Sequence, residues 1–380
     1  MMKGKRASRI ILKNARAAIR FRRRGRKHLR VLEESLPRED EFEELAEHEL
    51  SGAHAATQRF TPEQLIACER CLRANAPTRM NCLYCGAALP STAQSTALRR
   101  PVLKKLEEWE QGFNVVLLPR AGRELTPEEV GVAASLLRLD AARLVEIVEA
   151  RRALPLARAS SVAEGELILK RLGALGLAAE VFADDELLRQ PARIRALTLG
   201  EDALVCWPTL DAEPRRVAWS EVFLLVRGRV VTKRVEVEER RGQLKGRSEI
   251  VEVREIASDE AVLDIHAAAE TGDECFRVMA DNFDYSCLGA DKRLLARENF
   301  VTLVETLRAR APSAAFDDEY VSSRALLSAA WPPAERTESL GLRRERPGRL
   351  NTEAATVVTN EAQFTRYSRL RRRLALRGRG

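Results

Sequence analysis

Two pairs of cysteines constrain this 380-residue chain more than any other feature. Cys68 and Cys71 form one C-x-x-C pair, and Cys82 and Cys85 form a second pair ten residues later. Each pair places two thiolates on one tight turn, and two facing turns provide the tetrahedral four-sulfur site that a structural zinc ion prefers. The spacing therefore predicts a zinc ribbon over residues 60–90 with one structural zinc ion per chain. Iron is the alternative ion, but zinc is usual for four thiolates in a hairpin.

Gly86 directly follows the second pair, where a turn that folds back under a metal needs a residue that tolerates positive φ. Large apolar residues are few between Phe60 and Pro90, so the segment is expected to fold only with metal bound. Four cysteine ligands leave no open coordination position. The site is thus predicted to be a structural staple, or a ribbon that presents its turns to a protein or nucleic acid, and not a catalytic centre.

The length of the chain and the contexts of its other cysteines limit the number of domains and the compartment that can be expected. The chain is long enough for two or three domains, and aromatic residues make up only 5% of it. Cys206, Cys275 and Cys287 lie singly in apolar contexts, as buried thiols do in a reducing compartment. Since no run is long and apolar enough for a membrane span or a secretory signal, we expect a cytoplasmic protein without a transmembrane segment.

Charge is distributed unevenly along the chain. Residues 1–32 carry thirteen Lys or Arg and no acid, and residues 343–380 carry a net charge of +8. Because the whole chain carries +8, the middle is left with a net charge of −13. Residues 33–50 are strongly acidic, so residues 1–59 read as a basic and then acidic extension that is largely helical or disordered.

The basic N-terminal stretch has several possible roles. It contains Arg20, Arg22, Arg23 and Arg24 among apolar residues, which suits a basic helix on a nucleic-acid backbone or on an anionic membrane surface. An organellar transit peptide has a similar composition, although this stretch is poor in Ser. A solvated arm without a binding role is equally compatible with the composition.

Residues 91–111 are predicted to be a linker with some helix, and residues 112–186 a compact domain. Thr126 is placed to cap a helix that begins at Pro127, and Asp140 and Ser161 are placed to begin two more. Short apolar strands are expected at 113–118, 154–158 and 179–182. The predicted order is βααβαβ.

The segment from Leu172 to Val181, with Gly173 and Gly176, gives this region a resemblance to the C-terminal domain of the bacterial ribosomal stalk protein and to the related protease-adaptor fold. The Gly-rich, Lys-bearing turn that the stalk family uses to meet translation factors is absent; residues 136–143 stand there instead. Factor binding is therefore not implied. The resemblance implies a small α/β module of a kind that binds proteins.

Residues 190–312 change character to short Val-, Ile- and Leu-rich runs. Seven strands are expected, at 194–199, 203–207, 216–226, 230–238, 249–256, 261–266 and 275–280. A helix over 292–310 is expected to follow, with Leu294 and Leu295 on its apolar stripe. This layout, with the strand entry at Trp219, resembles a bacterial pleckstrin-homology-like barrel whose helix closes one end. Such domains mostly mediate protein contacts, so phosphoinositide binding is not implied.

Residues 313–380 are predicted to be a mostly disordered basic tail with one short helical motif at 360–376. Phe364, Tyr367 and Leu370 recur at helical spacing there, and Arg371, Arg372 and Arg373 follow them. The motif can dock on a partner or on RNA through these arginines, or be a solvated helix.

Candidate catalytic groups are few. Three of the four histidines fall in the extension, and the fourth, His266, lies on a predicted strand, where a core histidine is commoner than a general base. A hidden hydrolase or transferase site would need His266, Asp281 and Tyr285 to converge. The sequence thus predicts a multi-domain α+β, non-enzymatic zinc adaptor that binds a protein partner. The alternative is a ribosome- or nucleic-acid-associated protein that uses the ribbon and the Arg-rich ends.

Overall fold

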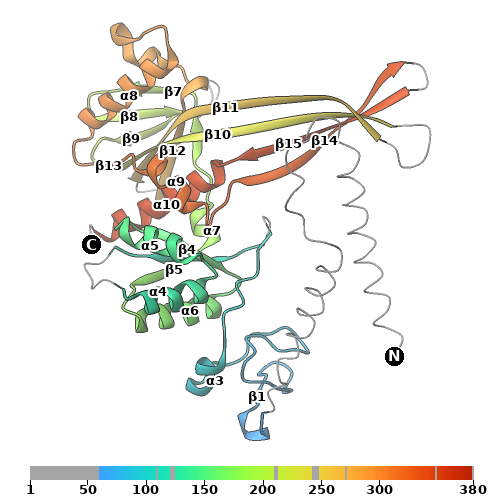
Figure 1. Cartoon of the computed structure of the whole chain (residues 1–380). Coiled ribbons are helices and arrows are strands. Elements are labelled where there is room, and N and C mark those ends of the chain that lie inside the picture. The colour runs from blue at the N-terminus through green and yellow to red at the C-terminus, as the bar shows by residue number, and fades with distance from the viewer. Residues whose placement is uncertain are drawn as a thin grey trace. The chain divides into compact units, whose positions relative to one another are not determined.

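The computed structural model describes residues 60–107, 110–119, 125–208, 213–241, 248–269, 272–346 and 349–378. It has a mixed α+β fold (Figure 1) and divides into two compact units. The described part of the smaller unit contains the 3-10 helix η1 (Pro62–Gln64) and a two-stranded sheet of β1 (Ile66–Ala67) and β2 (Ala74–Asn75). All other elements belong to the larger unit, which is described below. Residues 1–59, with the predicted basic and acidic extension, lie outside the described residues.

The first body of the larger unit follows a short helix, α3 (Ala93–Leu98). Its elements come in the order β3 (Phe113–Leu117), α4 (Pro127–Leu137), α5 (Ala141–Glu149), β4 (Leu154–Ala159), α6 (Val162–Ala174) and β5 (Ala179–Ala183). This is the βααβαβ order expected from the sequence. The strands form an antiparallel sheet in the order β4-β3-β5.

The side chains predicted to begin these helices do so. The Thr126 hydroxyl accepts from the backbone N–H of Glu129, and the Glu129 carboxylate accepts from the backbone N–H of Thr126, which is a complete capping box. The side chains of Asp140 and Ser161 likewise accept from backbone N–H groups in the first turns of α5 and α6. These local interactions set the helix starts and hence the positions of the strands between them.

The second body is a curled half-barrel of two sheets. One sheet contains β7 (Ala196–Leu199), β8 (Ala203–Trp207) and β9 (Arg215–Ala218), and the other runs β10 (Val222–Arg241), β11 (Ser248–Ala269), β12 (Gly272–Met279) and β6 (Ala192–Ile194). The 3-10 helices η2 (Ala280–Asn282) and η3 (Tyr285–Asp291) lead to α8 (Ala296–Arg310). Phe300, Leu303 and Leu307 of α8 join both sheets in one buried core.

The start of α8 differs from the prediction. The helix begins at Ala296 and not at residue 292, so Leu294 and Leu295 precede it and are exposed instead of lying on its buried stripe. The reason is a clamp that the sequence pattern does not reveal. The buried Asn299 side chain accepts from the backbone N–H of Arg293 at 2.6 Å and donates to its carbonyl oxygen at 2.9 Å, which fixes the non-helical segment before α8.

Two of the expected strand breaks do not occur. Residues 222–226 of the run 216–226 continue into the run 230–238 in the single 20-residue strand β10, whereas residues 216–218 belong to β9. The runs 249–256 and 261–266 are joined in the 22-residue strand β11. Gly228 interrupts the apolar pattern of β10 without making a turn. A Cβ on Gly228 would lie only 2.4 Å from Phe364 Cε2, so glycine serves there for close packing.

The prediction of a mostly disordered tail over residues 313–380 is wrong for the described residues. They form β13 (Ala315–Asp317), α9 (Tyr320–Leu327), the hairpin of β14 (Ala334–Arg346) and β15 (Arg349–Thr359), and α10 (Glu361–Arg377). The helical motif expected at 360–376 corresponds to α10. Hairpin strand β15 pairs with β10, which extends the sheet to the order β14-β15-β10-β11-β12-β6.

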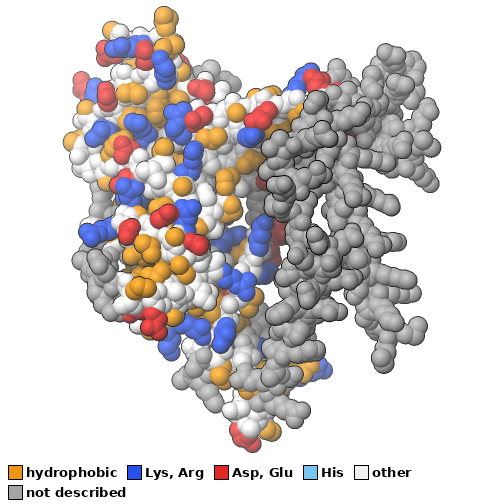
Figure 2. Space-filling model, viewed as in Figure 1, with side chains coloured by type: hydrophobic (Ala, Val, Ile, Leu, Met, Phe, Trp, Pro, Cys, Tyr) orange, Lys and Arg blue, Asp and Glu red, His pale blue; other side chains and the backbone are white. Residues whose placement is uncertain are grey.

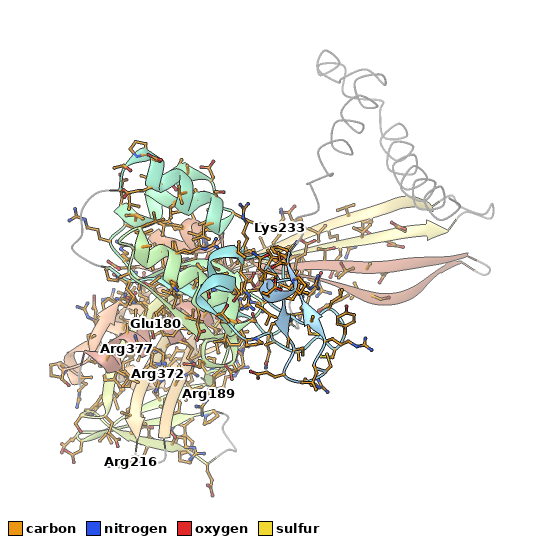
Figure 3. The ribbon with its side chains drawn as sticks, turned by 90° about the horizontal axis from the view of Figure 1, so that it is seen from below. Glu180, Arg189, Arg216, Lys233, Arg372 and Arg377 are labelled. Atoms are coloured by element: carbon orange, nitrogen blue, oxygen red, sulfur yellow. The ribbon has the colours of Figure 1, made fainter. Side chains whose placement is uncertain are left out.

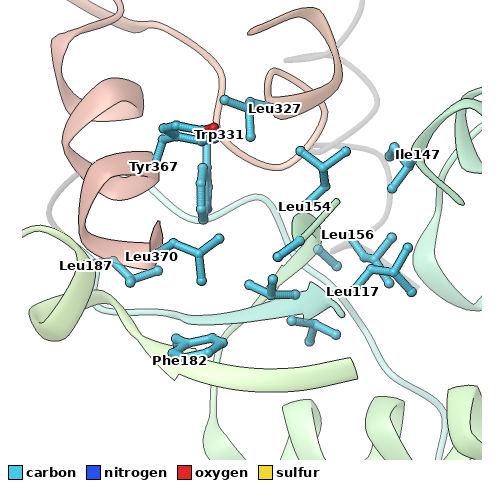
Figure 4. Close-up of a cluster of buried hydrophobic side chains, with 14 of the residues drawn as sticks. Leu117, Ile147, Leu154, Leu156, Phe182, Leu187, Leu327, Trp331, Tyr367 and Leu370 are labelled. Atoms are coloured by element: carbon cyan, nitrogen blue, oxygen red, sulfur yellow. The ribbon is translucent and has the colours of Figure 1, made fainter. Parts of the chain in front are cut away.

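The described part of the tail is ordered because its few apolar side chains complete the larger of the two cores among the described residues. Trp331, Tyr367 and Leu370 are buried in the same core as Leu154 and Leu156 of β4 (Figure 4). The indole N–H of Trp331 donates to Asn114 Oδ1 at 2.7 Å. The short helix α7 (Asp184–Leu187) packs against α10 at the same core. Composition could not predict these long-range contacts, because a segment with few apolar residues reads as solvated.

Candidate metal centre

Two turns of closely similar backbone carry the four predicted cysteines, and both belong to the larger unit. In the first turn, residues 68–73, the backbone N–H of Leu72 donates to the Cys68 carbonyl oxygen at 2.7 Å. In the second turn, residues 82–87, the N–H of Gly86 donates to the Cys82 carbonyl oxygen at 3.0 Å. A further bond closes each turn, from Cys68 N–H to Arg73 and from Cys82 N–H to Ala87.

The residue after each C-x-x-C pair has a left-handed backbone. Gly86 has φ +74°, as expected from its sequence position, and Leu72 occupies the equivalent position with φ +58°. A leucine in this region is strained by about 1–2 kcal/mol, whereas glycine is not. The first turn therefore holds Leu72 in a backbone conformation that leucine disfavours.

The turns bring all four sulfur atoms together. The Sγ atoms of Cys68 and Cys85 are 3.6 Å apart, as are those of Cys71 and Cys82, and all four lie within 4.8 Å of one another. The cysteines are buried or half-buried, and none is in a disulfide. This four-cysteine cluster can hold a metal ion.

The electrostatics of the four-cysteine cluster favour a bound cation. The backbone N–H of Cys71 lowers the pKa of the Cys68 thiol. At Cys71 the backbone N–H of Arg73 acts in the same direction, but desolvation and the adjacent sulfurs of Cys82, Cys85 and Cys68 raise the pKa of this thiol to about 12. Four thiolates this close repel one another, and a bound dication removes that repulsion.

Apolar side chains project from both turns. Leu72 is 80% exposed on the first turn, and Leu83 and Tyr84 are 63% and 54% exposed on the second. The Arg73 guanidinium lies 4.7 Å from the centre of the Tyr84 ring, which links the two turns by a cation–π contact. None of these residues was predicted as a functional candidate from the sequence, although their position inside or next to each C-x-x-C pair is a signal that points to them.

Of the arginines predicted to bind nucleic acid near the C-terminus, Arg371 and Arg373 stay partly exposed while they pair with acidic side chains. Arg372 is buried, Arg371 pairs with Asp317, and Arg373 pairs with Glu186 at 2.8 Å. Arg377 continues the series by pairing with Glu180 (Figure 3). On the face shown in Figure 2, blue and red side chains are interspersed over the described residues. Arg20, Arg22, Arg23 and Arg24 lie outside the described residues.

A second cluster of ligand-type side chains lies between β11, β12 and α10. It consists of Asp264, His266 and Cys275, all buried. Asp264 accepts two hydrogen bonds from the Arg277 guanidinium, at 2.7 and 2.8 Å, and His266 Nε2 lies 2.8 Å from Ser368 Oγ. The Asp264 carboxylate is thus already hydrogen-bonded to Arg277, and the cluster forms a buried polar contact with α10.

Burial explains the titration of this second cluster. It lowers the pKa of His266 to about 3, and it raises the pKa of the Cys275 thiol well above its ordinary value. Burial also acts to raise the pKa of Asp264, but the charge and hydrogen bonds of Arg277 outweigh it and lower that pKa. His266 is therefore neutral and Cys275 protonated at neutral pH.

The other proposed catalytic partners do not join His266. Tyr285 belongs to the half-barrel core together with Ile265, whereas His266, the next residue on β11, faces α10. The Tyr285 hydroxyl donates to the Ala280 carbonyl oxygen at 2.8 Å, and Asp281 is exposed. The three residues therefore do not converge on one pocket.

Comparison with known proteins gave no family model, no curated protein and no solved structure that matches this chain. The resemblances to the stalk-protein domain and to the pleckstrin-homology-like barrel thus remain predictions from the sequence layout. Among the described residues, no helix is both long and apolar enough to cross a membrane.

Proposed function

We propose that this chain is a non-enzymatic scaffold that binds a protein partner through its four-cysteine cluster, with a structural zinc ion in the cluster. The observation that carries the proposal is the exposure of Leu72, Leu83 and Tyr84 on the two cysteine turns. Apolar side chains fixed on a rigid, metal-held platform form a docking surface at low entropic cost, because little ordering is needed on binding.

The sulfur geometry supports zinc. A tetrahedral ion with Zn–S bonds of about 2.3 Å separates its sulfurs by about 3.8 Å. The two closest sulfur pairs are 3.6 Å apart, near this value. Since four protein ligands fill the coordination sphere, the ion stabilises the two turns and leaves no position for a substrate. Thiolate ligands of this kind survive in a reducing compartment, so we place the protein in the cytoplasm.

The first experiment is metal analysis and native mass spectrometry of the protein purified from its own cells, before and after nuclease treatment. We expect one zinc per chain and a protein partner that survives nuclease. The variant Leu83→Ser/Tyr84→Ser should lose this partner and keep its zinc. A matched control, Val132→Ser on α4, changes an apolar residue of similar exposure, 53%, and should keep both. Equal binding by all three proteins would refute the proposal.

A second candidate function is nucleic-acid association. The stacking of Arg73 on Tyr84 favours it, because aromatic and guanidinium planes together stack on unpaired bases. In that case the partner would leave with nuclease, and the logarithm of the binding constant would fall linearly with the logarithm of the salt concentration. Binding that is independent of salt would exclude this candidate.

A further inference from the structure

The strap, residues 89–103, connects the four-cysteine cluster to the βααβαβ body, and it is fastened at both ends. At its start, the backbone N–H of Leu89 donates to the Met80 carbonyl oxygen at 2.9 Å, and a β-bridge joins Asn81 to Ala88. These two contacts enclose the second cysteine turn. The position of the start of the strap therefore depends on the fold of that turn.

Arg99 ties the start of the strap to α6. It is 2% exposed, and its guanidinium donates to Ser91 Oγ at 2.7 Å and to the Pro90 carbonyl oxygen at 2.8 Å. The Arg171 guanidinium of α6 donates in turn to the Arg99 carbonyl oxygen. Within the described residues no carboxylate pairs with Arg99, and its Nε has no hydrogen-bond partner. Because a buried guanidinium without a counter-ion is costly, Arg99 stays inside only while these oxygens are held in place.

A buried carboxylate of α6 holds the end of the strap. Glu164 is 2% exposed, and its Oε1 accepts from the successive backbone N–H groups of Val102 and Leu103 at 2.6 and 2.8 Å. Its Oε2 accepts from the backbone N–H and the hydroxyl of Ser160. Burial acts to raise the pKa of Glu164, but these hydrogen bonds outweigh it and lower that pKa, so the carboxylate is charged at neutral pH.

The attachment to Glu164 holds the strap in a strained conformation. Leu103 has φ +42°, in the left-handed region that leucine adopts only at a cost. Two successive N–H groups turned toward one anion form the concave backbone arrangement called a nest. Leu103 also packs against the larger core. The carboxylate and the core contact therefore keep Leu103 in a conformation that the detached chain would leave.

We propose that the strap is a metal-dependent latch, in which a metal ion in the four-cysteine cluster and the attachment of residues 102–103 to α6 stabilise each other. Large apolar residues are few around the cysteines, so without the ion the turns do not keep Leu89 and Pro90 in place. Arg99 then loses its acceptors and moves into water, and the strained attachment at Glu164 opens. The inference rests on the metal site of the proposed function and is independent of any protein partner.

Thermodynamic linkage makes the latch testable from its far end. If the metal ion stabilises the latch by some factor, breaking the latch weakens metal binding by the same factor. Glu164→Gln removes the charge that the N–H groups of Val102 and Leu103 bind. Since a hydrogen bond to a charged group is worth roughly a tenfold change in an equilibrium constant, the metal dissociation constant should rise about 10- to 100-fold. Glu166→Gln removes the same charge from an exposed position of α6 and should leave the constant unchanged.

The measurement is competition for zinc between each full-length protein and a chromophoric chelator, with circular dichroism to verify folding. If the wild type binds zinc and Glu164→Gln binds it as tightly, the latch is overturned while the metal site stands. Equal weakening in Glu166→Gln would also overturn the latch, because the effect would then come from the charge of α6 alone. If the wild type binds no zinc, the metal site and the latch fail together.

Hydrogen exchange of the wild type gives a second readout, which decides the question if Glu164→Gln fails to fold. After removal of zinc, the amide protons of Val102 and Leu103 should exchange at least about tenfold faster, because they lose the Glu164 carboxylate. The amide proton of Val115 in the central strand β3 should keep its rate. An unchanged rate at Val102 and Leu103, or an equal increase at Val115, would overturn the proposal.

Discussion

Replacement of Gly228 by alanine tests whether α10 is held rigidly against β10. The new Cβ would lie 2.4 Å from Cε2 and 2.7 Å from Cδ2 of Phe364, and 2.9 Å from Tyr320 Cδ1. Carbon atoms in contact prefer about 3.5–4.0 Å, so Phe364 has to move by about 1 Å. Its ring cannot simply turn away, because Tyr320 packs edge-on at 4.9 Å and Arg277 lies over its face.

The clash should therefore be relieved by a shift of α10 itself. Inserting a methyl group into a packed site of this kind costs about 1–3 kcal/mol. We expect Gly228→Ala to lower the free energy of unfolding by an amount at the upper end of that range, measured by urea denaturation. The matched control is Gly173→Ala in α6, where a Cβ meets no atom within 4 Å. That substitution should stabilise the protein by about 1 kcal/mol, since alanine is the better helix former.

A double-mutant cycle makes the reasoning refutable. Phe364→Leu removes the ring atoms that the new methyl group would meet, so Gly228→Ala should cost at least about 1 kcal/mol less in that background. If Gly228→Ala costs less than about 0.5 kcal/mol, or costs the same in both backgrounds, α10 does not seat against β10 as described.

Three other sites give further predictions. Leu72→Gly should relieve left-handed strain and raise the stability of the first turn with metal bound by about 0.5 kcal/mol, while Gly86→Ala should lower that of the second turn by about 1 kcal/mol. Competition with a chelator measures both effects. A loss of stability in Leu72→Gly, or a gain in Gly86→Ala, would refute the equivalence of the two turns. Trp331→Ala should lower the free energy of unfolding by about 3–5 kcal/mol. Trp331→Phe should lower it by about 1–3 kcal/mol, because Asn114 Oδ1 loses its buried hydrogen-bond donor. A Trp331→Phe protein as stable as the wild type would show that the hydrogen bond is unimportant. Burial lowers the pKa of His266 to about 3 in the folded protein, against about 6.5 in the unfolded chain. The stabilisation of the fold by neutral His266 is therefore complete above pH 6.5 and is lost as the pH falls toward 3. Between about pH 6.5 and 5 this titration lowers the free energy of unfolding by about 2 kcal/mol. In urea titrations, the free energy of unfolding of His266→Phe should fall by about 2 kcal/mol less than that of the wild type over this pH range.

The elements that could be predicted from the sequence are those fixed by local chemistry. Thr126 with Glu129, Asp140 and Ser161 begin helices through bonds to residues two or three positions away, so a single window of sequence contains the signal. The C-x-x-C pairs are equally local, and the four sulfurs do come together. The left-handed turn at Gly86 was found for the same reason.

The errors concern residues whose partners are far away in the sequence. Gly228 reads as a break, but its role depends on Phe364, 136 positions later. The ion pairs of Arg371 with Asp317 and of Arg373 with Glu186 were likewise not predicted from the sequence, and a nucleic-acid contact of these arginines stays a prediction. Composition does not encode such pairings, and a tail with few apolar residues can be ordered when each of them is buried.

The position of α10 has a consequence for how the protein is made. This helix contacts β10 and α7 and bonds to side chains of β11 and β12, all of which precede it in the chain. During synthesis the earlier bodies emerge first, and Asp264 and His266 stay open to water until the arginine-rich helix has been translated. A ribosome that stalls before residue 360 would release a chain that lacks Phe364, Tyr367 and Leu370, so the core that these residues complete would stay open. Such a chain exposes the surfaces that chaperones and proteases recognise.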